Sequence, residues 1–172
     1  MLEIEYHHDM LRQAVIKSEE LGPLKGSFTE GERQWAGLLG EYAAKYHFRN
    51  LLENTENFYN NDLTIAGRKV EVKSKLHKFK LRDDFEWSLA ESSKHQKPDY
   101  YFFVSVYCNK DNLRDIKHIY LAGFISYKDF WDRAVFYKKG TKHANDFISP
   151  VDHYNIFQHE LKQFDKNKEV HR

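Results

Sequence analysis

Two short segments of alternating polarity, joined by Ala66-Gly67-Arg68, constrain the fold of this chain more than any other feature. Segment 62–65 reads Asp-Leu-Thr-Ile, and segment 69–73 reads Lys-Val-Glu-Val-Lys. Alternation with a period of two is typical of β-strands, and a glycine between two such segments suits a tight turn. The pattern therefore predicts a β-hairpin that buries one apolar face.

The aliphatic residues of this hairpin determine which side chains share a face. The buried face is expected to hold Leu63, Ile65, Val70 and Val72. A shift of one residue would put the two aliphatic pairs on opposite faces, so the parity of the register is fixed. Asp62, Glu71 and Lys73 then share the other face, where opposite side chains lie about 5 Å apart and diagonal ones about 7–8 Å. Two carboxylates and an ammonium are therefore expected to converge.

This combination of charges predicts a metal site. Two adjacent carboxylates repel each other, so a cation between them favours their charged form. Oxygen ligands with a few waters suit Mg²⁺, for which Mn²⁺ is expected to substitute. Such an ion polarises a phosphodiester and activates a water, and Lys73 would orient that water or stabilise charge in the transition state. Glu41, from a preceding helix, could add a further carboxylate to the ion or its water.

The helix that carries Glu41 is expected to begin at Thr29, which forms a capping-box pattern with Glu32. Its apolar face is predicted to consist of Trp35, Leu38, Leu39, Tyr42 and Tyr46. Glu41 lies at the border of that apolar face. Glu32 is the alternative candidate for the helical carboxylate of the site, although its capping position favours a structural role. Gly37 and Gly40 each cost roughly 1 kcal/mol relative to alanine inside a helix, so they predict close packing against another element.

These residues resemble the active-site pattern of the PD-(D/E)XK nuclease superfamily. The resemblance is carried by residues 40–43 (Gly-Glu-Tyr-Ala), 61–62 (Asn-Asp) and 70–73 (Val-Glu-Val-Lys). It implies an α/β fold with a restriction-endonuclease-like αβββαβ core. It also implies a metal held by Asp62, Glu71 and the backbone carbonyl of Val72, with Lys73 at the attacking water. Asn61 stands where the family has a proline with a structural role, so the difference removes no group that takes part in the reaction.

The remaining elements are expected around this centre. Helices are predicted over Asp9–Leu21 and over Ser126–Ala134, where Ser126 is the N-cap, and strands over Phe85–Leu89, Tyr100–Tyr107 and Lys117–Ile125. Residues from Phe136 onward show no clear pattern. We expect a single α/β nuclease domain over residues 1–172, with its core at about 29–125, an N-terminal helix and a C-terminal extension. Its mixed central sheet would be flanked by helices.

Two basic clusters are candidates for contacts with nucleic-acid phosphates, although a solvated surface explains them equally well. They comprise Lys75, Lys78, Lys80 and Arg82 in the first, and Lys138, Lys139 and Lys142 in the second. Gln96 precedes the strand at Tyr100, where some nucleases place a supporting glutamine. Trp87, Tyr100 and Tyr101 could stack on bases, but core packing is the better interpretation. The ten histidines show no firm metal-ligand spacing.

Composition restricts the function only weakly. The net charge is +1, from 27 basic and 26 acidic residues, so any contact with nucleic acid must come from local patches. A single cysteine, Cys108, excludes a cysteine-based zinc site. Neither a signal-peptide pattern nor a membrane-spanning apolar run is present, which favours a cytoplasmic protein without a membrane partner.

The expected function is therefore Mg²⁺-dependent endonucleolytic hydrolysis of DNA by a metal-activated water. Cutting both strands would need two active sites, which a homodimer would supply. Two alternatives remain open. One is a nuclease of the same fold that acts in resolution or repair, or on RNA. The other is a non-catalytic binding module, in which Glu71 and Lys73 are only the solvated face of an ordinary hairpin.

Overall fold

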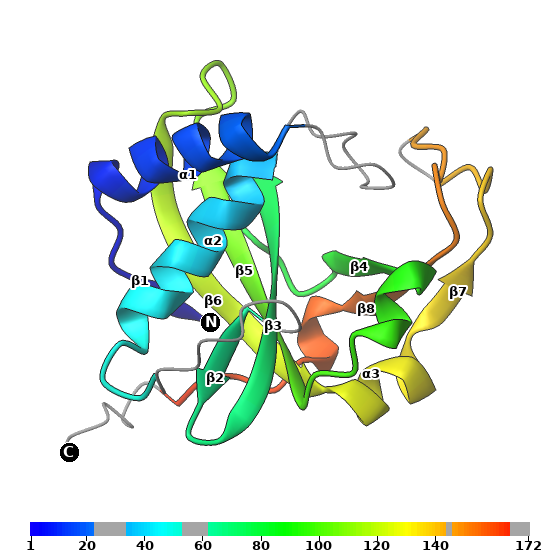
Figure 1. Ribbon diagram of the computed structural model, residues 1–172. Coiled ribbons are helices and arrows are strands. Elements are labelled where there is room, and N and C mark those ends of the chain that lie inside the picture. Colours follow the sequence, from blue (N-terminus) through cyan, green and yellow to red (C-terminus); the bar gives the residue numbers. More distant parts are fainter. Residues whose placement is uncertain (23–33, 53–61, 144–145, 166–172) are drawn as a thin grey trace.

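The structure, a computed structural model, describes residues 1–22, 34–52, 62–143 and 146–165 and has a mixed α/β architecture (Figure 1). Its helices are α1 (His8–Leu21), α2 (Gln34–His47) and α3 (Tyr127–Arg133). Its strands are β1 (Leu2–Ile4), β2 (Leu63–Ile65), β3 (Arg68–His77), β4 (Glu86–Ala90), β5 (Tyr100–Cys108), β6 (Ile116–Ser126), β7 (Val135–Tyr137) and β8 (His153–Phe157). Short 3-10 helices follow β4 at Glu91–His95 and β8 at Gln158–Glu160.

The larger sheet has the strand order β1-β6-β5-β3-β2. Strands β3 and β5 run parallel, whereas every other neighbouring pair is antiparallel. Strand β5 is central and buried along most of its length, as its apolar sequence predicts. Helices α1 and α2 cover one face of this sheet (Figure 1), where Leu39 and Ala43 join Val104 and Val106 in one hydrophobic core.

The other face is covered by a second, three-stranded antiparallel sheet of order β4-β8-β7, together with α3. A second core forms there from Trp87, Phe103, Phe130 and Ile156. Helices therefore cover one face of the central sheet, and a sheet with one short helix covers the other. The αβββαβ order is not confirmed, because β4 lies outside the main sheet and only a 3-10 helix precedes β5.

The predicted hairpin is present and has a two-residue turn. Ala66 (φ 48°) and Gly67 (φ 74°) both adopt left-handed backbone conformations, as the tightest hairpin turns require. Leu63 lies opposite Val70, so the aliphatic side chains share a face as the sequence predicts. Strand β3 continues to His77, beyond the predicted end at Lys73, because β5 pairs with it along that whole length.

Helix α2 buries a different face from the one predicted. Trp35 and Leu39 are buried as expected, but Leu38, Tyr42 and Tyr46 are only partly buried. The deepest positions are instead taken by small residues, namely Ala36, Gly40, Ala43 and Ala44. Small side chains let α2 lie close to the sheet, while the larger side chains of Leu38, Tyr42 and Tyr46 stay partly exposed. The capping pattern of Thr29 and Glu32 lies outside the described residues.

The two helix glycines differ in their surroundings. A Cβ atom placed on Gly40 would lie 2.7 Å from Cβ of Ser74 and 3.3 Å from a methyl carbon of Val104. A Cβ atom on Gly37 would meet no atom within 4 Å. The predicted close packing is therefore confirmed for Gly40, where α2 crosses β3. At Gly37 the contact is made by the backbone, since its carbonyl accepts a hydrogen bond from the Ser74 hydroxyl at 3.4 Å, and the Cβ direction is open.

Three strands have no counterpart in the expected elements. Strand β1 pairs with β6 at the edge of the main sheet, and β7 and β8 complete the second sheet. Ser126 caps α3 as predicted, since its hydroxyl accepts a hydrogen bond from the Asp129 N–H. No helix in the described ranges has the length and apolar character needed to cross a bilayer.

Candidate active site

Strand β3 presents Glu71 and Lys73 on the face that is turned toward the second sheet. Glu71 is only 5% exposed, and its Oε1 accepts a hydrogen bond from Nζ of Lys73 at 2.7 Å. Nζ of Lys73 also lies 3.5 Å from Oε1 of Gln96, a residue just after the 3-10 helix that precedes β5. The ammonium is therefore held between a carboxylate and an amide oxygen.

Asp62 lies directly before β2 and faces the same region. Its Oδ2 accepts a hydrogen bond from the Val72 N–H at 2.7 Å. Extending the hairpin register by one position puts Asp62 opposite Glu71. The N–H and C=O of one strand residue point to the same side, so the Val72 carbonyl also points to the edge of β3 where Asp62 lies. The arrangement agrees with the face predicted from the alternating sequence.

Glu41 reaches this region from α2. It directly follows Gly40, where an added Cβ would lie 2.7 Å from Cβ of Ser74 on β3. Burial and then the charge of Asp62 raise the pKa of Glu41 to about 8, and Glu71 adds to this rise. Lys45 and Lys73 act in the opposite direction. The charges of Asp62 and Glu71 therefore act on the Glu41 carboxylate.

Asp62 responds to the same neighbours. Burial and then the charge of Glu71 raise the pKa of Asp62 to about 6, whereas the Val72 N–H and the ammoniums of Lys73 and Lys45 lower it. Burial and neighbouring negative charge thus disfavour the ionised forms of Glu41 and Asp62. A divalent cation would offset both effects.

The donor set fits Mg²⁺ or Mn²⁺ in its chemistry, since it consists of carboxylate oxygens and one backbone carbonyl. In the described part of the chain, however, no three His, Cys, Asp or Glu side chains converge closely enough to hold an ion as they stand. Oε1 of Glu71 is bound to Lys73, and Oδ2 of Asp62 to the backbone of β3. Binding of an ion would require these carboxylates to turn away from their present partners.

The basic clusters do not lie with the carboxylates. Nζ of Lys75 donates to the backbone carbonyl of Glu86 at 3.0 Å and sits over the Phe85 ring, and burial lowers the pKa of this ammonium. Lys78 and Lys80 are exposed beyond the end of β3 at His77, which lies roughly 20 Å along the strand from Glu71 at about 3.3 Å per residue.

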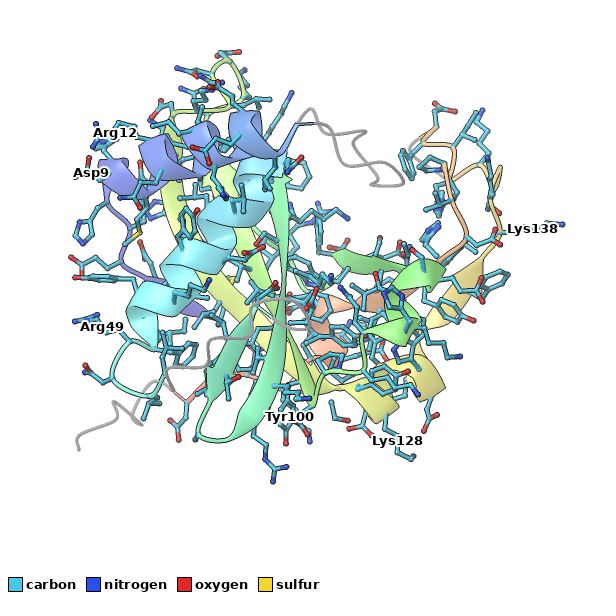
Figure 2. All side chains as sticks on the ribbon, viewed as in Figure 1. Asp9, Arg12, Arg49, Tyr100, Lys128 and Lys138 are labelled. Atoms are coloured by element: carbon cyan, nitrogen blue, oxygen red, sulfur yellow. The ribbon has the colours of Figure 1, made fainter. Side chains whose placement is uncertain are left out.

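The remaining predicted basic residues also lie at the surface. Arg82 pairs with Asp84, and Lys142 pairs with Asp146. Lys138 and Lys139 are exposed just after β7, and Figure 2 shows Lys138 at the outer edge of the molecule, well away from α2.

Lys45 is a site residue that the sequence interpretation did not assign. Its ammonium opposes the raised pKa values of both Glu41 and Asp62. The available signal was its spacing, because a lysine four residues after a glutamate shares one face of a helix with it. Trp87 and Tyr101, at 1% and 0% exposed, belong to the core, as the better of their two interpretations predicts.

No family model matches this chain. Neither a curated protein nor a solved structure matches it either.

The raised pKa values predict a specific dependence of stability on pH. Glu41 titrates near its ordinary value of 4.5 in the unfolded chain but at about 8 in the folded protein, so the folded state binds more protons between these values. Stability should therefore fall as pH rises from about 4.5 to 8, by about 1.4 kcal/mol per unit of pKa difference. In thermal melts in EDTA, the melting temperature of Glu41→Gln should change less with pH than that of wild type. Glu20 is exposed on α1, so Glu20→Gln should keep the wild-type dependence on pH. The same dependence in wild type and Glu41→Gln would contradict the arrangement.

Proposed function

We propose that this protein is a Mg²⁺-dependent endonuclease that hydrolyses phosphodiester bonds of DNA. One observation carries the proposal: the largely buried carboxylates of Glu41, Asp62 and Glu71 act on one another's charge beside the ammonium of Lys73, which also lies next to Gln96. On an ordinary solvated hairpin face, carboxylates stay in water and apart from one another. Here burial and mutual repulsion both disfavour their charged forms, as is common at functional sites. The proposal includes a restriction-endonuclease-like arrangement of α2 and the hairpin within this α/β fold.

Each residue has a distinct part in this reaction. The carboxylates of Asp62, Glu71 and Glu41, with the Val72 carbonyl, would hold the ion. When bound, Mg²⁺ polarises the phosphodiester and lowers the pKa of a water. Lys73 contributes a positive charge that can orient the attacking water or stabilise the additional negative charge on the phosphate in the transition state. Gln96 positions that ammonium through its side-chain oxygen.

Release of Lys73 from Glu71 is part of the proposal. In the absence of an ion the two side chains neutralise each other at 2.7 Å. A cation bound at Glu71 would repel the ammonium toward Gln96 and the substrate, because like charges at this distance disfavour each other. A second copy of the chain would supply the second active site that a double-strand cut needs.

A plasmid-nicking assay tests the proposal. Wild-type protein should convert supercoiled DNA to the nicked form with Mg²⁺ or Mn²⁺ and should be inactive in EDTA. Asp62→Ala should lose the activity, because it removes one of the two acids that flank the strand edge. Equal nicking by both proteins, or nicking that persists in EDTA, would overturn the proposal. The alternative, a module that binds without cleaving, would then be favoured by the ion pair that already satisfies Glu71.

A further inference from the structure

Four aromatic side chains form a continuous strip from α3 to β7 at the rim of the second core. They are Tyr127, Trp131, Tyr154 and Phe136. The ring centroids lie 6.2 Å apart between Tyr127 and Trp131, 4.9 Å between Trp131 and Tyr154, and 5.1 Å between Tyr154 and Phe136. Three of these rings are half-buried, and Phe136 is 47% exposed. The strip thus has one side in the protein and the other open to a ligand.

The aromatic strip is bonded to the strand next to the carboxylate cluster. Nε1 of Trp131 donates a hydrogen bond to the Tyr101 hydroxyl at 3.3 Å. Tyr101 is the register partner of Glu71 across β3 and β5, and it lies on the same face. Tyr101 is buried, so this hydrogen bond fixes the strip beside the strand that flanks Glu71.

Positive charge accompanies the strip, and one of the two acids of α3 is already paired. Nζ of Lys94 lies 5.3 Å above the Trp131 ring, on a side chain that is exposed to solvent. On α3, Asp132 pairs with Lys128. Figure 2 shows Lys128 on α3 and Lys138 beyond β7, at the two ends of this side of the molecule. Lys138 makes no ion pair within the described residues.

Aromatic rings interleaved with cations suit one ligand above others, a nucleic-acid strand with unpaired bases. Each unpaired base offers a flat face to a ring, and the backbone offers phosphates to lysines. A duplex keeps its base faces stacked inside and offers them only at its ends. We propose that the aromatic strip and Lys94 bind unpaired nucleobases, so that the nuclease acts on strands with a single-stranded segment. This inference rests on the proposed function and specifies its substrate.

Binding can be measured without cleavage by working in EDTA. Labelled single-stranded DNA, single-stranded RNA and duplex DNA of the same sequence should be compared by fluorescence anisotropy. We expect a single strand to bind more tightly than the duplex, and the DNA and RNA arms then identify the sugar. Phe136→Ala should weaken binding of the single strand by roughly five- to hundredfold, the range observed for loss of one stacked base.

Phe79→Ala is the matched control, since Phe79 is a 56% exposed phenylalanine on the β3–β4 connection, outside the strip. It should bind like wild type. Trp131 provides a second readout because the other two tryptophans, Trp35 and Trp87, are buried. Single strands should quench its emission, and Trp131→Phe should abolish the quenching while keeping a ring at that position.

The proposal is overturned if duplex binds as tightly as single strand, if Phe136→Ala and Phe79→Ala bind alike, or if quenching survives in Trp131→Phe. It is also overturned if Phe136→Ala changes only self-association. These results are separable from the nicking assay. If single strands bind the strip but no Mg²⁺-dependent cleavage occurs, the proposed catalysis is refuted and the strand-binding proposal stands. If the protein nicks DNA but the strip binds no single strand, the strand-binding proposal is refuted and the proposed catalysis stands.

Discussion

Glu71→Gln should lose Mg²⁺-dependent cleavage almost completely, by at least about 10³-fold in rate. The substitution keeps the size and hydrogen-bonding capacity of a side chain that is 5% exposed, but it removes a negative charge and an oxygen donor from the proposed metal site. Removal of one transition-state stabilising group alone costs about 10²–10³-fold. A residue that holds the ion should cost at least as much. Rates from single-turnover cleavage at saturating Mg²⁺ provide the measurement.

Lys73→Met separates the two parts of the site. Its cleavage rate should fall about 10²–10³-fold, but calorimetric titration should still show a bound divalent ion, because all the carboxylates remain. Glu71→Gln should lose that binding isotherm. Glu86→Gln is the matched control, since its carboxylate bonds to Asn155 on the second sheet rather than to the cluster. Loss of cleavage in this control, or equal metal binding by Glu71→Gln and wild type, would refute the assigned roles.

Gly40→Ala should destabilise the protein by about 1–3 kcal/mol and reduce cleavage at the same time. The added methyl group would lie 2.7 Å from Cβ of Ser74, an atom fixed to the backbone of β3, so α2 or β3 must move. Glu41 is the next residue, and any outward shift of α2 carries its carboxylate away from Asp62. Urea denaturation and the cleavage assay together measure both effects.

Gly37→Ala is the matched control on the same helix. A Cβ atom there meets nothing within 4 Å, so the substitution should stabilise the protein by up to about 1 kcal/mol through helix propensity. Its cleavage rate should equal that of wild type. Destabilisation by both alanines would show that the contact with Ser74 is not the cause.

The sequence predicts the hairpin well because its signals are local. A period of two, two aliphatic pairs and a glycine determine which face holds Asp62 and Glu71, and no distant residue is needed for that conclusion. The approach of α2 is different. Periodicity favoured the large side chains Leu38 and Tyr42 for the buried face, but the close crossing at Gly40 selects small ones. Helical periodicity records which residues are apolar and does not record how near the partner lies.

The second sheet could not be predicted for a related reason. Strand β8 buries His153 and Asn155 at 1% and 6% exposure, so its sequence lacks the apolar alternation of a half-buried strand. Its partner β4 lies far away in the sequence, and β7 has only three residues. The position of Gln96 beside Lys73 likewise depends on the parallel pairing of β3 with β5, which no local pattern reports.

The main sheet closes late in the chain. Leu2 pairs with Leu121 and Glu3 with Tyr120, so β1 finds its partner only after β6 has been synthesised. Pairing between such distant segments slows folding, whereas the β2–β3 hairpin can form from neighbours. The two acids of the hairpin can therefore meet early, while α2 and the segment with Gln96 join them only as the rest of the sheet assembles. A nascent chain that ends before β6 would contain every residue of the proposed site and would still leave β1 without its strand.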